Sequence, residues 1–457
     1  MSEKKTRKRI AVSEETKLLN KTRKLLPINT LEVEISQHVE HRTYRKSNKN
    51  KYFKQDAVRY VASVTEEMRQ LQNTIQGVVY KRFLNLAKTK KYRGMMKSYR
   101  KLNEQILKIE KNKKVSKEEK EVLSKLKISK KELSDKIEDL RIEHKIAKTF
   151  VVEDASMLKD TTFKRVNSIL ALKCADRVWL AMEKLMYSNG QKLRFKKAGE
   201  MPSLEGKQAS RGIILKLNKE DKLYLSYDKF KFNLKIKKDD LYTIETLEHI
   251  KEYMVSGTDI ESQNIELLKN NKKMISTYRV LYNRIVLKKI RGKLRLFLQI
   301  VYEGATVPKR KKDGSFRHSY GEGNVGCDVG TQSIAVVSKN NVFLKNLAER
   351  SKNAFNYENK VRLVVKAMDR SRRANNKDFY NIDGTFKKYK DRAKNVKIRC
   401  SKKYLKLINK HRELHRKAAL SRKYAINEDV NKIRALGDKA IVEKMSIQGS
   451  QLKVEWI

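Results

Sequence analysis

Two acidic residues follow apolar runs that have the character of short strands. Asp328 ends the run VGCD within Gly321–Leu344, and Glu443 ends the run AIVE. If those strands are neighbours, both carboxylates reach one place, and oxygen ligands are what divalent ions such as Mg²⁺ prefer. Two such ions about 4 Å apart can activate a water and stabilise the leaving oxygen of a phosphodiester. The pattern therefore predicts a two-metal centre on Asp328 and Glu443. Alternatively, Asp328 caps a backbone and Glu443 pairs with a basic side chain.

Two other motifs with catalytic potential are weaker. HRELH places His411 and His415 on one helical face, but its glutamate is not at the second position that a zinc protease requires. Packing or phosphate contact is the favoured interpretation of this pair. The segment that begins at Asp328 lacks G-x-x-x-x-G-K, which excludes a P-loop there.

The elements around the two carboxylates can be read from local patterns. Turns at Gly330 and Asn341 divide Gly321–Leu344 into three short strands. A helix over 353–369 and a loop follow. A long basic helix then begins at Lys402, and Gly437 is expected to end it in a left-handed cap. Residues 438–445 are predicted to form a short buried strand. Within 402–424, aromatic residues alternate with Lys and Arg, which favours a phosphate-tracking surface over a merely solvated face.

The N-terminal half combines helices with a β-rich region. Residues 1–50 are basic and favour either an arm that orders on nucleic acid or a disordered tail. Within 56–144, an antiparallel helical hairpin or small bundle is predicted, or else a partner-binding coiled coil. The pattern consists of apolar residues at i, i+4, i+7: Leu102, Ile106, Ile109, Leu133, Ile137 and Leu140. Helical pattern continues over 150–187. Alternating runs beyond residue 208 predict strands, two of them joined at Arg291–Lys293, with a helix over 244–255 inserted.

The charge of the chain points to a polyanionic partner. Its 457 residues carry 108 Lys+Arg against 53 Asp+Glu, a formal net charge of +55. Phosphates relieve self-repulsion on this scale, so nucleic acid is the leading candidate. Three well-separated cysteines, without a C-x-x-C pair, favour free thiols in a reducing compartment. No apolar run approaches a signal core or a membrane span. We therefore expect an intracellular protein, with neither a membrane nor a small-molecule substrate as partner.

Several segments in order resemble one family. The four segments are GCDVGTQSIAVV, RSRRANN with YNIDGTFKK, SKKYLKLINKHRELHRKAALSRK and IRALGDKAIVEKMSIQG. Together they resemble the TnpB proteins, which are transposon-encoded RNA-guided DNA endonucleases related to type V CRISPR effectors. The resemblance is strong over about 194–449. It implies that Asp328 matches the first RuvC aspartate and Glu443 the second-motif glutamate, with Mg²⁺ as cofactor. It also implies a guide RNA from the transposon end and target double-stranded DNA as partners, and a cytoplasmic, nucleoid-associated location in a prokaryote.

The resemblance implies a multidomain α+β fold, in which a β-barrel wedge domain with a helical recognition insertion precedes an RNase H-like (RuvC) α/β domain. The expected segments are a basic arm and the start of the barrel (1–55), helical recognition domain (56–187), β-rich wedge domain (188–308), linker (309–323) and partial RuvC domain (324–457). The residues expected to contact nucleic acid are Arg370, Arg372, Arg373, Lys387, Lys388, Lys402, Lys403, Arg412 and Arg416.

The sequence also departs from the family. Family members continue through a basic helix, a zinc ribbon with paired C-x-x-C motifs and a third RuvC aspartate, whereas this sequence ends at GSQLKVEWI with no cysteine after Cys400. We therefore expect an incomplete RuvC domain, no zinc ribbon and weakened two-metal binding. RNA-guided DNA binding is then better supported than cleavage. The alternatives are a nuclease-deficient binder or decayed transposon remnant, and a basic scaffold that coats nucleic acid without a guide.

Overall fold

The computed structural model describes residues 13–36, 38–43, 51–110, 117–187, 193–228, 230–270, 272, 274–330, 332–346, 352–388, 391 and 398–442. The chain forms two compact units, one of Met1–Lys288 with Leu294–Val307, the other of Lys289–Lys293 with Pro308–Ile457. Both contain helices and strands, so the predicted mixed α+β class is confirmed. No helix in the described ranges has the length and apolar character needed to cross a membrane.

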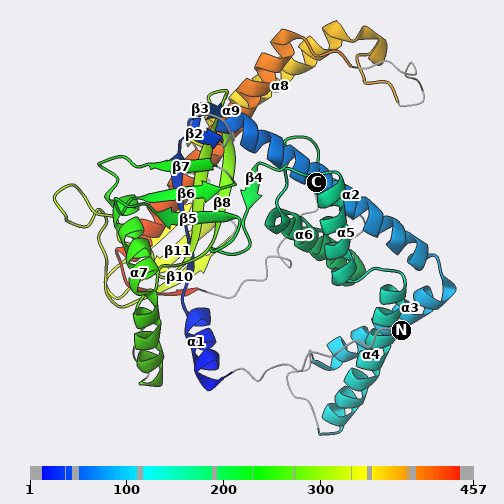
Figure 1. Ribbon diagram of the computed structural model, residues 1–457, viewed down its shortest axis with the longest axis horizontal. Coiled ribbons are helices and arrows are strands. Elements are labelled where there is room, and N and C mark those ends of the chain that lie inside the picture. The colour runs from blue at the N-terminus through cyan, green and yellow to red at the C-terminus, as the bar shows by residue number, and fades with distance from the viewer. Residues whose placement is uncertain are drawn as a thin grey trace. The chain divides into compact units, whose positions relative to one another are not determined.

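A curled half-barrel sheet forms one part of the first unit (Figure 1). Its strand order is β4-β8-β9-β1-β7-β6-β5. The strands are β1 (Ile28–Ile35), β4 (Ser203–Glu205), β5 (Ile213–Leu217), β6 (Leu223–Tyr227), β7 (Phe230–Lys235), β8 (Arg279–Ile290) and β9 (Lys293–Glu303). Arg291 and Gly292 both have positive φ at the turn between β8 and β9, which confirms the predicted connection there. A separate pair is formed by β2 (His38–Thr43) and β3 (Lys51–Asp56).

Seven helices belong to the same unit within the described ranges. They are α1 (Glu14–Leu25), α2 (Ala57–Ala87), α3 (Lys90–Glu110), α4 (Lys117–Glu143), α5 (Lys148–Thr161), α6 (Ser168–Tyr187) and α7 (Leu241–Lys269). The predicted helix over 244–255 is therefore part of a longer one. Lys127 of α4 contacts Glu110 at the end of α3, and Lys130, later in α4, contacts Asn103, earlier in α3. The two helices therefore run in opposite directions. The predicted antiparallel hairpin is thus confirmed.

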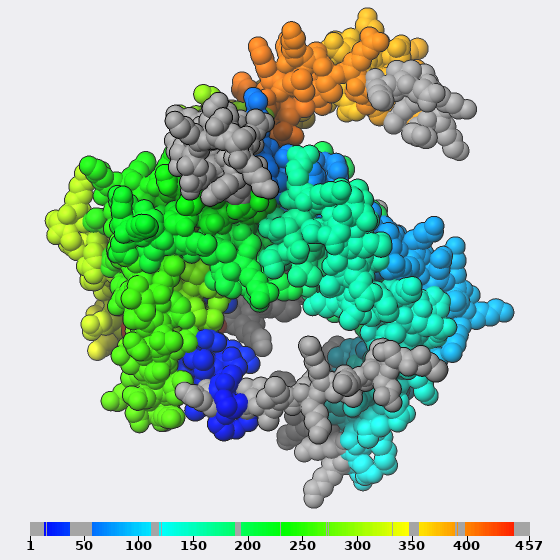
Figure 2. All heavy atoms as spheres, in the orientation of Figure 1, coloured from blue at the N-terminus to red at the C-terminus, as the bar shows by residue number. Residues whose placement is uncertain are grey.

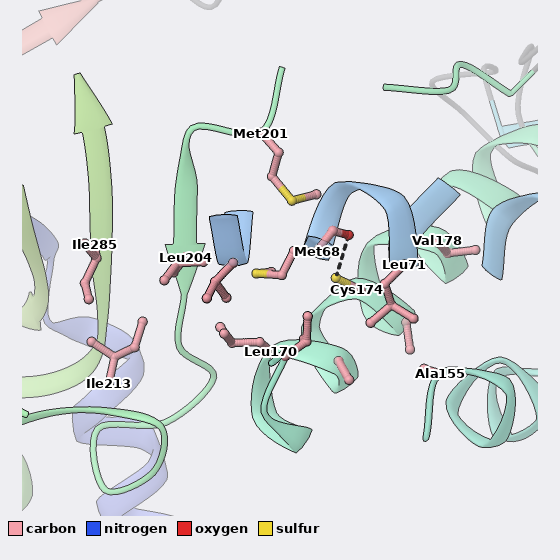
Figure 3. Close-up of a cluster of buried hydrophobic side chains, with 14 of the residues drawn as sticks. Met68, Leu71, Ala155, Leu170, Cys174, Val178, Met201, Leu204, Ile213 and Ile285 are labelled. Atoms are coloured by element: carbon pink, nitrogen blue, oxygen red, sulfur yellow. Dashed lines mark hydrogen bonds between the residues drawn. The ribbon is translucent and has the colours of Figure 1, made fainter. Parts of the chain in front are cut away.

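The main core lies between α2, α6 and the strands (Figure 3). The core includes four fully buried side chains that pack toward Leu204 of β4: Met68 and Leu71 of α2, and Leu170 and Cys174 of α6. Buried residues recur every three or four positions on α2 and every four on α6, so each helix presents one apolar stripe. In the space-filling view, helical and strand residues of this unit form a continuous surface (Figure 2).

The second unit is built on a four-stranded sheet of order β12-β11-β10-β13. Its strands are β10 (Asn324–Val329), β11 (Ser333–Val337), β12 (Val342–Asn346) and β13 (Lys439–Val442). The first three confirm the three predicted strands, and the bonds from Gly330 N to Ser333 O and from Ser338 N to Asn341 O, 2.9 and 2.8 Å long, close their turns. Two long helices, α8 (Lys352–Asn375) and α9 (Lys402–Arg434), lie side by side, with a short 3₁₀ helix, η2 (Lys377–Phe379), between them in sequence (Figure 1).

Two predictions for this unit are wrong. The strand near residue 440 is not buried, because β13 lies at the sheet edge and all four of its residues are exposed. Gly437 does not have the positive φ of a left-handed cap. A Cβ at Gly437 would lie 2.5 Å from the oxygen of Gly323 and 2.6 Å from Cγ2 of Val325. Close approach of two backbone segments, rather than helix capping, explains why glycine occupies this position.

Candidate functional site

The predicted carboxylate Asp328 lies on the open face of the second unit's sheet. Val325 and Cys327 of β10 are buried, while Asp328, one position further on, points to the opposite side and is exposed. Strand side chains alternate between faces, so the local sequence alone fixes this separation. The covered face packs on Ile433 and Leu436, from the end of α9 and just after it. An ion pair between Lys345 of β12 and buried Asp429 of α9 holds the same face.

On the open face, the residues next to Asp328 are small or apolar. Gly326 precedes Asp328 on this face, and Ala335 of β11 is its direct partner across the ladder. A Cβ at Gly326 would have a single close neighbour, the oxygen of Val337 at 3.8 Å, so this side of the strand is open. Leu344 of β12 is 73% exposed and contributes to the same surface. Ile441, opposite Gly326, is also exposed. Gly326 and Ala335 thus leave space directly beside the Asp328 carboxylate, and the bulkier Ile441 and Leu344 lie one strand further away on each side.

Asp328 has no protein partner in the described part of the chain. It makes no hydrogen bond or ion pair with another described residue, and among the described residues on the open face it is the single carboxylate. In a protein with a net charge of +55, an exposed acid that attracts no basic side chain is notable. The capping interpretation of Asp328 has no support in the described contacts.

The second predicted carboxylate, Glu443, lies outside the described residues. What the structure does give is the register up to the preceding residue. β13 runs parallel to β10, with Ile441 opposite Gly326 and Val442 opposite Cys327. Asp328 and Glu443 are therefore each the next residue after a paired position, and neighbouring Cα atoms in a chain are about 3.8 Å apart.

Glycines and one aspartate hold the start of β10 against the start of β13. The carboxylate of Asp438 accepts a 2.9 Å hydrogen bond from Gly323 N, and Asp438 N donates to Gly323 O at 3.1 Å. Gly321 N donates to the oxygen of Arg434, the last residue of α9, at 2.9 Å. The sheet pairing is thus anchored to the end of α9.

Seven of the predicted nucleic-acid residues lie where α8 ends, in the following loop and where α9 begins: Arg370, Arg372, Arg373, Lys387, Lys388, Lys402 and Lys403. Two reciprocal hydrogen bonds bring these segments together, since Asn376 Nδ2 donates to Arg399 O at 2.9 Å and Arg399 N donates to Asn376 Oδ1 at 2.6 Å. Asn376 is buried. These two hydrogen bonds, which we call the polar closure, therefore gather the cations at one end of the helix pair.

Aromatic rings in the loop support two of the arginines. The guanidinium of Arg372 lies 4.7 Å from the ring centre of Phe386, and that of Arg373 lies 5.8 Å from that of Tyr380. Lys387, another predicted contact, donates its backbone N–H to Phe379 O at 2.9 Å. The sequence prediction named the basic residues but missed the rings, whose signal was their alternation with Lys and Arg in the loop. Stacking of this kind orients a guanidinium and leaves its edge for a phosphate.

The remaining two predicted contacts lie further along α9. Arg412 is exposed and has no partner among the described residues, whereas Arg416 forms a bidentate ion pair with Glu413 at 2.7 and 2.9 Å. The hydrogen bond from Arg416 lowers the pKa of Glu413. None of these cations surrounds Asp328. At about 1.5 Å per residue, the 33 residues of α9 separate Lys402 from the sheet end by about 50 Å.

The two histidines of HRELH face each other on α9. Their Nε2 atoms are 3.1 Å apart. Burial lowers the pKa of His411, and the nearby charges of His415 and Arg412 lower it further. Within the described ranges no three His, Cys, Asp or Glu side chains are grouped so as to hold a metal ion. This result gives no support to a zinc site at His411 and His415. Asp328 as an oxygen ligand of Mg²⁺ stays a prediction, based on the preference of that ion for carboxylates.

Comparisons with known proteins give remote structural likeness and no match in sequence. No protein-family model matches the chain, and neither does any curated protein. Among solved structures it is similar to one titled "Cryo-EM structure of the Cas12f1-sgRNA-target DNA complex", with a TM-score of 0.36 and 11% sequence identity. The alignment covers 92% of this chain and 81% of that one.

Proposed function

We propose that this protein is an RNA-guided DNA-binding protein of the TnpB type, with a metal-binding RuvC-like centre at Asp328 and Glu443. The observation that carries the proposal is the parallel register of β10 and β13, which pairs Cys327 with Val442. Asp328 follows Cys327 on β10, and Glu443 is the residue that follows Val442 in the sequence. Parallel strands lie about 4.8 Å apart, so two acids in such positions can share a divalent cation.

The surroundings of Asp328 support this assignment. Its exposure and lack of a described partner leave the carboxylate available to a cation, and Gly326 and Ala335 leave room for a sugar–phosphate backbone. A divalent ion bound there would supply a polarised phosphate and a water of lowered pKa. The protein's own part is to hold Asp328 in a fixed strand geometry, on a face that Ile433 and Leu436 do not cover.

The cationic end of α8 and α9 supports nucleic-acid binding separately from any cleavage. Exposed, unpaired side chains such as Arg370, Lys402 and Lys403 contribute charge without a described acidic partner. Their contacts would be with phosphates, which carry no sequence information. Sequence specificity would come from base pairing with a guide RNA, with the protein reading a short flanking motif.

The proposal is tested with the full chain purified from cells that also express its flanking DNA. RNA bound to the protein is sequenced, and the complex is incubated with matched double-stranded DNA and Mg²⁺. We expect one defined RNA species and guide-dependent DNA binding. Any Mg²⁺-dependent cleavage should disappear in Asp328→Ala and persist in Glu322→Gln, which alters an exposed acid just before β10. Purification without a defined RNA species refutes the guided function.

A second candidate is a guided binder without nuclease activity. The specific observation in its favour is that about 50 Å of helix lies between the cations at the start of α9 and the sheet that carries Asp328, so nucleic acid can bind at those cations without engaging the carboxylate. For this candidate, guide-dependent DNA binding persists with no Mg²⁺-dependent cleavage, and Asp328→Ala changes neither. Cleavage that disappears in Asp328→Ala would exclude it.

A further inference from the structure

A cavity in the helical part of the first unit belongs to none of the sites described so far. It lies between α2, α3 and α6 and has a volume of about 570 Å³. Small-molecule sites usually occupy about 300–1,000 Å³, so one nucleotide-sized group can enter it. Its lining divides into an apolar floor and a basic rim: Phe83, Ala87, Tyr92, Met96, Leu185 and Met186, then Arg93, Lys97, Arg100 and Lys101, with Glu104 as the single acid.

Two aromatic side chains form a fixed corner of the floor. The rings of Phe83 and Tyr92 are 6.3 Å apart and perpendicular. Tyr92 is 4% exposed, and its hydroxyl accepts a 3.2 Å hydrogen bond from Nη2 of Arg141. The side chain of Arg141 is itself buried, and its guanidinium lies 4.4 Å from the ring centre of Tyr187. The buried arginine thus fixes the tyrosine ring, which makes the floor a rigid apolar surface.

The rim consists of four cations on one side of α3. Arg93, Lys97 and Lys101 follow at intervals of four residues, and Arg100 lies three beyond Lys97. Such spacings place side chains on a common helix face. All four are exposed, and none of their side chains forms a hydrogen bond or ion pair with a described residue. A merely solvated helix face usually mixes charges of both signs, whereas here four like charges surround an apolar hollow. A polyanion would relieve that repulsion.

We propose that this cavity holds one unpaired nucleotide of a bound nucleic acid, its base against Phe83 and Met96 and its neighbouring phosphates on the α3 cations. An apolar floor beside a row of cations matches the way single strands bind, with bases stacked on rings and a basic groove along the backbone. The inference rests on the nucleic-acid binding of the proposed function but not on guiding or cleavage. An acidic peptide would use the rim and leave the floor empty.

The test uses the full chain and a short single-stranded RNA that contains one pyrrolocytosine, a fluorescent base whose emission falls when it stacks. We expect quenching on binding, and about tenfold weaker binding of a matched oligonucleotide that is abasic at that position, about 1.4 kcal/mol. Ala87→Trp fills the cavity without removing charge, so quenching should disappear while the salt dependence of binding stays the same. Phe83→Leu, which removes the ring and keeps an apolar side chain, should reduce quenching and serves if Ala87→Trp fails to fold.

Charge variants separate the rim from general electrostatics. Each of Lys97→Gln and Arg100→Gln should lower the slope of log affinity against log salt by about 0.7, as expected for one phosphate contact of a single strand, and should weaken quenching. The matched controls are Lys131→Gln and Lys136→Gln on α4, exposed cations without a described partner, which should leave quenching unchanged.

Two results would overturn the proposal. One is equal binding of the abasic and intact RNAs with unchanged fluorescence. The other is full quenching by folded Ala87→Trp, since the base would then stack elsewhere. Competition by an acidic peptide that Ala87→Trp leaves unaffected would assign the rim to peptides and also overturn it. Asp328→Ala should quench like the wild type, so failure of the nuclease proposal and failure of this one remain distinguishable.

Discussion

Val442 of β13 lies directly opposite Cys327 of β10, in a parallel pair at the edge of the second unit's sheet. Because the pair is parallel, both strands leave this position in the same direction. The next residues in the sequence are Asp328 and the proposed second ligand, Glu443. The proposed centre needs this register, because a one-residue shift turns the side chains of a strand to the other face of the sheet. The position of the candidate centre therefore depends on how β10 and β13 are anchored.

A metal-binding role for Asp328 predicts a Mg²⁺-dependent gain in stability. At a Mg²⁺ concentration a hundred times the dissociation constant, bound metal stabilises the folded chain by about 2.7 kcal/mol. Asp328→Asn should remove that gain, measured as the Mg²⁺-induced shift in Tm. Without metal, the same variant should lie within about 0.5 kcal/mol of the wild type, because Asp328 is exposed and makes no described contact. A Mg²⁺ shift that survives in Asp328→Asn but not in Glu322→Gln would contradict the assignment.

Two glycine substitutions test the anchoring of the sheet. Gly437→Ala places a methyl group 2.5 Å from the Gly323 oxygen and should destabilise this region by about 1–3 kcal/mol. Gly326→Ala is the matched control on the neighbouring strand, where the nearest atom is 3.8 Å away. Hydrogen exchange of the β10 amides should become faster in Gly437→Ala alone. Equal exchange rates in both variants would show that the close approach is not needed.

The polar closure at the base of the α8–α9 loop should control nucleic-acid binding indirectly. Asn376→Ala removes both hydrogen bonds to Arg399 and leaves backbone groups there unpaired, at a cost of about 1–3 kcal/mol. We expect faster hydrogen exchange over 376–388 and weaker nucleic-acid binding. The neighbouring Asn375→Ala is the control, because Asn375 is exposed and its described side-chain bond is to Ser371 O within α8.

Arg412 and Arg416 should differ in their contribution to binding. Arg412→Gln removes a cation with no described partner and should lower the slope of log affinity against log salt by about 0.9 on double-stranded DNA. Arg416→Gln should change it less, because Glu413 already pairs with Arg416. If the two variants behave alike, the ion pair is broken in the complex.

The three cysteines should react at very different rates. Cys400 is exposed and Cys174 is buried. Burial raises the pKa of the Cys174 thiol to about 12, so little thiolate forms at neutral pH. Alkylation followed by mass spectrometry should label Cys400 first and Cys174 only after unfolding. Since the thiol ionises near pH 8.5 in the unfolded chain, its stabilising contribution is complete below that pH and is lost as the pH rises toward the folded value. Early labelling of Cys174 would contradict the packing of α6.

Local patterns predicted those elements whose residues alternate clearly. The apolar stripe that includes Ile106, Ile137 and Leu140 predicted the α3–α4 hairpin. In the structure each of these side chains is buried. The apolar run VGCD and the following Gly330 predicted the strand that carries Asp328, which the structure shows as β10. Both inferences needed neighbouring residues only.

Features that depend on distant segments could not be predicted. Gly437 follows a helix, where a cap is the common interpretation, but its neighbour in space is Gly323, more than a hundred residues earlier. The exposure of β13 depends on its place at the edge of the sheet, which no local pattern encodes. The ring contacts of Arg372 and Arg373 require the fold of the intervening loop.

The length of α9 sets a spacing between its two ends. The cations near Lys402 begin the helix, and the sheet that carries Asp328 is anchored to Arg434 at its end. At about 3.4 Å per base step, the roughly 50 Å of helix corresponds to about 15 base pairs of B-form duplex. If a duplex followed α9, the length of the helix would set the number of base pairs between its contact with those cations and its contact with the Asp328 carboxylate. The insertion or deletion of helical turns would change that number.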